Sequence, residues 1–193
     1  MKYAFAVLGI GFIFIIGFMS IGMDNQKDMS ATQETAFTLT SSVFVDGETI
    51  PQKYSCDGDN VNPPLSISGV PEGTQSLVLV MDDPDIPQVF KDERGIDSFD
   101  HWVVYAIDPT TSEIEEGKVF GAHGVNGRGA ETYTGPCPPP EYEPTTHRYI
   151  FTLYALSGTL NFITTPTKAD VLTAIEAMII EKTQLIGVYD RSH

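Results

Sequence analysis

Three apolar runs, separated by segments rich in proline and glycine, constrain most strongly what this chain can fold into. Ser76–Met81 is almost continuously apolar, and Trp102–Ile107 and Arg148–Leu156 have the same character. Short runs of this kind, rich in β-branched and aromatic residues, are typical of strands that are covered on both faces. Alternating apolar residues predict another strand in 36–45, and 185–189 has the pattern of a last strand. The sequence therefore predicts a mostly-β fold.

One segment near the end of the chain has a helical period instead. Thr167 is followed three residues later by Asp170, which is typical of a capping box, and Pro166 marks the start. Between 168 and 182 the apolar residues that share one helix face are Val171, Leu172, Ile175, Met178 and Ile179. We therefore expect one late helix over 168–182, before the last strand.

The first residues differ from the rest of the chain. Tyr3–Met23 carries no charge, and about 20 apolar residues suffice to cross a bilayer as a helix. Because Lys2 precedes this run and Asp24 follows it, the amino terminus should stay inside while the domain is exported. The segment 1–23 is either a cleaved signal peptide, which the small residues in Ser20–Gly22 favour, or a retained transmembrane anchor. We favour the anchor because the apolar run is longer than a usual signal core of about 7–15 residues.

A buried helix of the core is the remaining alternative for this first segment. The polar residues 24–35 show no periodicity and are predicted to form a flexible tether. The globular domain then occupies 36–193, a length sufficient for one hydrophobic core. We expect the protein to be exported. It is either anchored in the membrane by the N-terminal helix, with the domain outside, or secreted after cleavage.

The charge of the chain excludes some classes of partner. Lys and Arg number 11 against 26 Asp and Glu, which gives a net charge of −15. Such a protein is not expected to bind nucleic acid, because binding to the phosphate backbone needs a surplus of Lys and Arg. The same charge repels anionic ligands at long range, so any site for an anion must be a local pocket.

Carboxylates, histidines and proline-rich loops, which often form binding sites, lie in three places at the ends of predicted strands. Asp82–Pro87 follows one buried strand and Asp100–Trp102 begins another. Gly135–Pro140 is a proline-rich loop, and His147–Tyr149 begins the next strand. Rigid loops at strand ends are common positions for binding sites. Taken one by one, the same residues are also typical of Asp-Pro turns, core histidines and rigid connections.

Taken together, these segments resemble the phosphatidylethanolamine-binding protein family, also called the Raf kinase inhibitor family, and in particular its bacterial and archaeal branch. The resemblance runs from Lys53 to Arg191. Its ordered motifs are Tyr54–Gly58, Asn62–Ser66, Asp83–Pro87, Asp100–Tyr105, Gly135–Pro139, His147–Tyr149 and Leu153–Leu156. The resemblance implies an antiparallel β-sandwich with the C-terminal helix, and a small pocket that binds phosphate, acetate or a phosphorylated headgroup.

The resemblance also implies which residues line that pocket. Carried over one by one, they are Asp83, Pro87, His101, Gly135, Pro136, His147 and Tyr149. Two imidazoles and the backbone N–H groups beside Gly135 could donate to an anion. Asp83 would orient a neighbouring histidine and favour its protonation, and Tyr149 would add a hydroxyl or an aromatic wall. The variable segment 88–99 receives no site role, and Glu181–Gln184 departs from the family pattern.

The predicted function is that of a non-catalytic, regulatory domain that needs no cofactor. The sequence contains no nucleophile elbow, Walker loop, dinucleotide-binding motif or His-Glu-x-x-His motif. Members of this branch are described as similar to kinase regulators or protease inhibitors, so a kinase or a protease is the protein partner implied. The alternative is a metal-dependent hydrolase, with Asp83, Asp85, His101 and His147 as ligands.

The two cysteines, Cys56 and Cys137, are too few for a disulfide framework or a zinc ribbon. They could form one bridge, since each lies beside a family motif and export favours oxidation. The same motifs occur in family members without an export signal, so the sequence leaves their pairing open.

Overall fold

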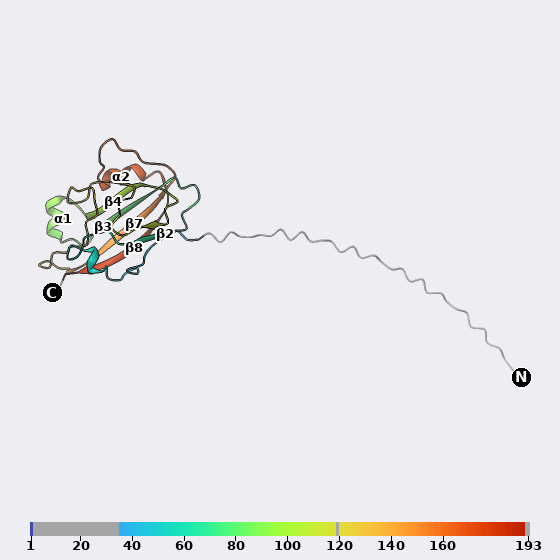
Figure 1. Ribbon diagram of the computed structural model, residues 1–193, viewed down its shortest axis with the longest axis horizontal. Coiled ribbons are helices and arrows are strands. Elements are labelled where there is room, and N and C mark those ends of the chain that lie inside the picture. Colours follow the sequence, from blue (N-terminus) through green and yellow to red (C-terminus); the bar gives the residue numbers. More distant parts are fainter. Residues whose placement is uncertain (2–34, 119, 192–193) are drawn as a thin grey trace. The chain divides into compact units, whose positions relative to one another are not determined.

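The computed structural model describes residues 1, 35–118 and 120–191 (Figure 1). The described residues from 35 onward belong to one compact unit. The helix predicted over 1–23 and the tether predicted over 24–35 lie outside the described residues, apart from Met1 and Thr35. In the part of the chain that is described, no helix combines the length and the apolar character needed to cross a bilayer.

The larger of two sheets has five antiparallel strands in the order β6-β4-β3-β7-β8. These strands are β3 (Ser76–Asp83), β4 (Phe99–Ile107), β6 (Ala122–His123), β7 (Thr146–Leu156) and β8 (Ile179–Asp190). The side chains of the central strand alternate between two buried clusters: Leu77 and Leu79 lie in one, Val78 and Val80 in the other. Because both faces of β3 are covered, its sequence is apolar continuously from Leu77 to Met81 rather than at every second position.

A smaller sheet of three antiparallel strands shares the first of these clusters. Its strands, in the order β1-β2-β5, are β1 (Thr38–Ser41), β2 (Leu65–Ser68) and β5 (Glu113–Ile114). Leu39, Leu65 and Ile114 are buried together with Leu77 and Phe151 of the larger sheet. The predicted mostly-β fold is confirmed as two sheets with few helices.

Helix α2 (Lys168–Ile175) contributes to the second cluster. Val171 and Ile175 are completely buried there. The side chain of Thr167 accepts a hydrogen bond from the amide of Asp170, whose carboxylate accepts one from the amide of Thr167. The predicted capping box is therefore present, and it satisfies two amides that the first turn of a helix leaves free.

The predicted end of this helix was wrong. Ile175 is the last helical residue, and β8 begins at Ile179 rather than at 185. Ile179 lies opposite Leu156 of β7, and Lys182 lies opposite Tyr154. Pairing with a long neighbouring strand satisfies the backbone of this segment and outweighs its helical period.

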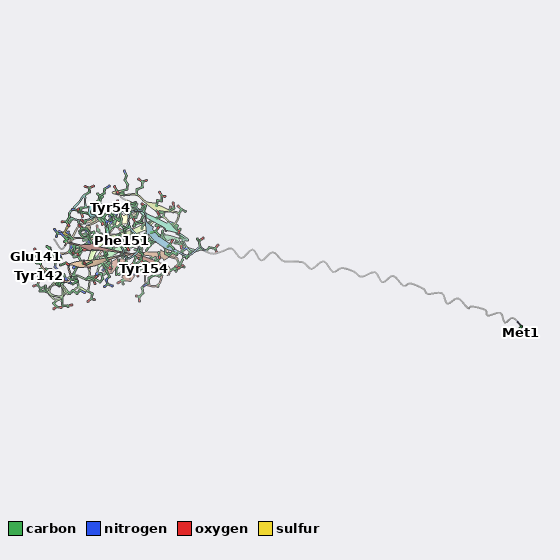
Figure 2. All side chains as sticks on the ribbon, turned by 90° about the horizontal axis from the view of Figure 1, so that it is seen from below. Met1, Tyr54, Glu141, Tyr142, Phe151 and Tyr154 are labelled. Atoms are coloured by element: carbon green, nitrogen blue, oxygen red, sulfur yellow. A yellow bond between two sulfur atoms is a disulfide. The ribbon has the colours of Figure 1, made fainter. Side chains whose placement is uncertain are left out.

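The connections between strands determine what surrounds the ends of β3 and β7. Helix α1 (Gln88–Arg94) was not predicted; it follows β3, ends at Gly95 with φ 64°, and has no buried residue (Figure 1). A short 3-10 helix, η1, spans Gln52–Tyr54. In Figure 2 Phe151 lies inside the domain, whereas Tyr142 lies at its periphery. The ring of Tyr142 packs edge-on against Phe90 of α1, with 5.2 Å between centroids.

Candidate functional site

A cavity of about 240 Å³ lies where the end of β3, the start of β4 and the start of β7 meet helix α1 and the proline-rich loop. It is lined by Asp83, Ile86, Pro87, Phe90, Arg94, Ile96, Phe99, His101, Arg128, Cys137, Pro138, Pro139 and His147. Four of the residues predicted from the sequence, Asp83, Pro87, His101 and His147, are therefore brought together here. The other three, Gly135, Pro136 and Tyr149, are buried behind the lining.

Asp83 and His147 form a buried pair on the wall of the cavity. The Nδ1 atom of His147 lies 2.6 Å from Oδ2 of Asp83, and Nε2 lies 3.0 Å from the carbonyl oxygen of Pro144. Since both partners accept hydrogen bonds, both ring nitrogens carry a proton and the imidazole is positively charged. Burial alone lowers the pKa of His147, but the hydrogen bond and charge of Asp83, with the Pro144 carbonyl, raise it above its ordinary value.

His101 has the opposite character. The residue is 4% exposed, and Nδ1 lies 2.7 Å from the carbonyl oxygen of Thr134, to which it donates. Burial lowers the pKa of His101 to about 4, against the opposing effects of the Thr134 carbonyl and the nearby Asp83 carboxylate. A neutral ring that donates from Nδ1 has a bare Nε2, which accepts hydrogen bonds. The expectation that two imidazoles would donate to an anion is therefore not met in this structure.

Tyr149 supports the two imidazoles from behind. Its ring meets the edge of His101 with 5.1 Å between centroids and stacks on His147 at 6.5 Å. Burial raises the pKa of Tyr149 well above its usual range, so the hydroxyl stays protonated. The amide of Cys137 is directed at this hydroxyl without forming a full hydrogen bond. Tyr149 thus acts as a wall behind the site.

Gly135 serves close packing rather than ligand contact. Its amide donates to Oδ1 of Asn60 over 2.8 Å, so this one N–H is already used. A Cβ atom at this position would lie 2.2 Å from the carbonyl oxygen of Tyr54. Pro136, the next residue, accepts a hydrogen bond from the amide of Cys56 through its carbonyl. These contacts hold the proline-rich loop against the turn that follows η1.

A disulfide fixes the same contact covalently. Cys56 is bonded to Cys137, with 5.4 Å between the Cα atoms and 81 residues between them in sequence. Cys137 lines the cavity together with Pro138 and Pro139. The bridge therefore attaches one wall of the cavity to the 3-10 turn near the start of the domain.

The four residues of the metal-site alternative do not converge as ligands. Asp85 turns away from the cavity and binds Arg148 through both carboxylate oxygens, each 2.7 Å from a guanidinium nitrogen. The hydrogen bond from Arg148 lowers the pKa of Asp85 more than partial burial raises it. Both nitrogens of His147 and one of His101 are already engaged. Within residues 35–118 and 120–191, no group of three His, Cys, Asp or Glu side chains is arranged to hold a metal ion.

The cationic side of the cavity was not predicted from the sequence. Arg94 of α1 and Arg128 of the 124–134 loop both reach the lining, although 88–99 was given no site role. Among the residues that the structure describes, neither guanidinium is engaged in an ion pair or a hydrogen bond. Asp83 is the lone carboxylate of the described lining, and His147 balances its charge. The cavity is therefore locally positive in a strongly acidic chain.

The segment 88–99 also supplies an apolar rim, through Phe90, Ile96 and Phe99. One signal could have indicated this: a short stretch ending in Arg-Gly directly after Pro87 is typical of a helix with a glycine C-cap. Such a helix, beginning beside a site residue, must place part of its surface near the site.

Comparisons with known proteins agree with the resemblance. A family model described as phosphatidylethanolamine-binding protein matches residues 40–190. A UPF0098 protein of Chlamydia pneumoniae is 39% identical over 155 residues, which cover 80% of this chain and 99% of that protein. A UPF0098 protein of Methanothermobacter thermautotrophicus is 39% identical over 160 residues, covering 79% of this chain and 98% of that protein.

Solved structures similar to this chain also come from the phosphatidylethanolamine-binding protein family. A crystal structure from Chlamydia trachomatis, described as a phosphatidylethanolamine-binding protein homologue, has 39% sequence identity and a TM-score of 0.74. The structure of Escherichia coli YbcL, described as a new member of the mammalian family, has 26% identity and a TM-score of 0.70. Each match covers 81% of this chain and 99% of the other.

Proposed function

Because the chain belongs to the phosphatidylethanolamine-binding protein family, we propose that its domain is a non-catalytic binding module for a small phosphate-like anion or a phosphorylated headgroup. One observation carries this proposal: Arg94 and Arg128 bring two guanidinium groups, unpaired among the described residues, to a cavity whose carboxylate, Asp83, is already neutralised by His147. Guanidinium groups bind phosphate oxygens through charge-assisted, often bidentate hydrogen bonds.

The form of the cavity supports the same ligand class. A volume of about 240 Å³ accommodates a small headgroup rather than a large cofactor. The apolar rim of Phe90, Ile96 and Phe99 suits the organic part of a phosphate ester, while the arginines suit its oxygens. We propose a regulatory role for such binding, with a kinase or a protease as the protein partner implied by the family.

The hydrolase alternative has no comparable support. A metal-dependent hydrolase needs several free ligands around one point and an open coordination position. Here Asp85 binds Arg148, and Asp83 binds His147. We therefore retain the binding module as the proposed function.

We also propose that the domain is exported and that segment 1–23 anchors it at the outer face of the membrane that it crosses. The charge asymmetry around that segment is the basis of this proposal. Fractionation of cells with N-terminal sequencing tests it: full-length chain should be found in the membrane fraction. A shortened soluble form would show that the segment is a cleaved signal, and a soluble cytosolic pool of full-length chain would refute export.

Calorimetric titration with inorganic phosphate tests the binding function. We expect binding that weakens at least tenfold in each of Arg94→Gln and Arg128→Gln, since a hydrogen bond to a charged group contributes about 1.5–3 kcal/mol. Lys182→Gln, on the exposed part of β8, makes the same change in net charge away from the cavity and should leave affinity within about twofold. Absence of phosphate binding, or binding unaffected by loss of both arginines, would refute the proposal.

A further inference from the structure

The polar floor of the cavity accepts hydrogen bonds but has none to donate. The Nδ1–H of His101 is committed to the carbonyl of Thr134, which leaves Nε2 as a bare acceptor. In the described part of the chain Nε2 has no hydrogen-bond partner, and it is not sealed from solvent; the cavity is where the ring is exposed. An unpaired acceptor at the bottom of a ligand cavity selects for a ligand that brings a donor.

The other polar groups of the floor do not supply that donor. Both N–H groups of His147 are used by Asp83 and the Pro144 carbonyl. Asp83 itself accepts, through Oδ2 from His147 and through Oδ1 from the amide of Asp85. The nearby residues Pro138 and Pro139 have no N–H. The remaining side-chain donors of the described lining are those of Arg94 and Arg128.

The charged groups around His101 come from three elements. Asp83 of β3 and Asp100 of β4 favour protonation of the ring, whereas Arg128 of the 124–134 loop opposes it. The aromatic rings of Phe99 and Tyr149 close two sides, at 4.9 Å and 5.1 Å between centroids. Burial by these neighbours keeps the ring neutral, and the hydrogen bond from Nδ1 to Thr134 fixes the tautomer, with Nε2 toward the cavity.

We propose that this cavity selects oxyanions that still carry a hydroxyl proton: hydrogen phosphate, or the singly charged form of a phosphate monoester. The hydroxyl donates to Nε2 of His101, and the unprotonated oxygens accept from Arg94 and Arg128. This inference rests on the proposed anion-binding function and makes it more specific. Sulfate is similar in shape and charge but has no proton at neutral pH, so one of its oxygens would face the lone pair of Nε2.

The two sources of this chemistry, free phosphate and a phosphorylated headgroup, differ in their pH dependence. Inorganic phosphate keeps at least one hydroxyl proton throughout the neutral range. A phosphate monoester loses its last proton with a pKa near 6. Monoester binding should therefore weaken at least fivefold between pH 5.5 and pH 7.5, while binding of inorganic phosphate changes less. A diester has no such proton and should bind no better than sulfate.

The first experiment compares four probes by calorimetry at fixed ionic strength: inorganic phosphate, sulfate, methyl phosphate and dimethyl phosphate. At pH 7 phosphate should bind at least tenfold more tightly than sulfate, because sulfate leaves the buried acceptor unpaired. Equal affinity for phosphate and sulfate would overturn the proton-based selectivity but leave anion binding intact. Absence of binding by every probe would instead overturn the proposed function.

The second experiment observes the ring itself. Long-range ¹H–¹⁵N spectra should show Nε2 of His101 without a proton, both free and with phosphate bound. A protonated Nε2 in the complex would overturn the inference, since the ring would then donate a hydrogen bond and sulfate could bind as tightly as phosphate. His101→Phe should abolish the discrimination between phosphate and sulfate, because it removes both the acceptor that phosphate uses and the lone pair that sulfate faces. Because the spectra use the unaltered protein, the test does not depend on the folding of this variant.

Discussion

The carboxylate of Asp83 and the imidazole of His147, 64 residues apart in sequence, lie 2.6 Å apart in the interior. The strands that carry them, β3 and β7, are direct neighbours in the larger sheet. The side chains are 3% and 0% exposed. The pair therefore links the packing of the sheet to the chemistry of the cavity.

Removal of the negative partner of this pair should be costly. We expect Asp83→Asn to lower the free energy of unfolding by about 3–5 kcal/mol, because it leaves His147 without the charge that stabilises its protonated form. Urea denaturation measures the loss. Asp85→Asn breaks a neighbouring pair whose arginine is 54% exposed, and it should cost about 1 kcal/mol or less. Equal losses in the two variants would contradict the importance of burial here.

The free energy of unfolding should fall as the pH rises above 6.5 and also as the pH falls below 6.5. The folded state raises the pKa of His147, so its stabilising contribution is complete below 6.5 and is lost as pH rises through the raised value. The folded state lowers the pKa of His101 to about 4, so unfolding is favoured as pH falls from 6.5 toward 4. We expect the urea midpoint to be highest near pH 6.5.

Variants separate the two contributions to this profile. His147→Gln should flatten the decline above pH 6.5, and His101→Gln should flatten the decline below it. A wild-type midpoint that stays constant from pH 5 to pH 8 would show that neither histidine is perturbed as described.

The disulfide should stabilise the domain substantially. Closure of a loop of 81 residues corresponds to about 4 kcal/mol in the chain-entropy model. The double variant Cys56→Ser, Cys137→Ser should lose stability of that order, and reduced wild-type protein should match it in urea denaturation. Phosphate affinity should also fall, because Cys137 forms part of the cavity wall. Stability equal to that of the oxidised protein would refute a structural role for the bridge.

Gly135 should tolerate no side chain. We expect Gly135→Ala to destabilise the domain by about 3 kcal/mol, because the new Cβ would overlap the backbone of Tyr54, which cannot move freely. Gly158→Ala is the matched control: its nearest neighbour is the sulfur of Met178, the flexible end of a side chain. Thermal unfolding compares the two, and a smaller effect at Gly135 than at Gly158 would contradict the close packing.

The sequence was sufficient to predict the family, the mostly-β class and four of the cavity residues. Asp83 and His101 could be assigned because each lies in a motif of the family resemblance, beside a strand whose apolar character is visible in the sequence. The amide of Gly135 itself is not available as a donor, since it is taken by Asn60, 75 residues away. Sequence order does not reveal such a long-range hydrogen bond.

Arg94 and Arg128 could not be assigned for a different reason. Both are exposed, charged residues in connecting segments, where sequence patterns do not show which way a side chain points. The start of β8, which occupies the end of the predicted helix, was also not predictable from local sequence patterns. Ile179 fits either element by its spacing, and the partner strand β7 decides between them.

Helix α1 contributes Phe90 and Arg94 to the cavity but contributes no buried residue to the core. This part of the cavity lining is therefore independent of the hydrophobic core, unlike Asp83, His101 and His147, which are buried. Between Pro87 and Phe99 the segment can be exchanged for one of similar length with little disturbance to either sheet. Natural divergence can alter selectivity in this way, and a designer could graft a new recognition helix onto the same scaffold.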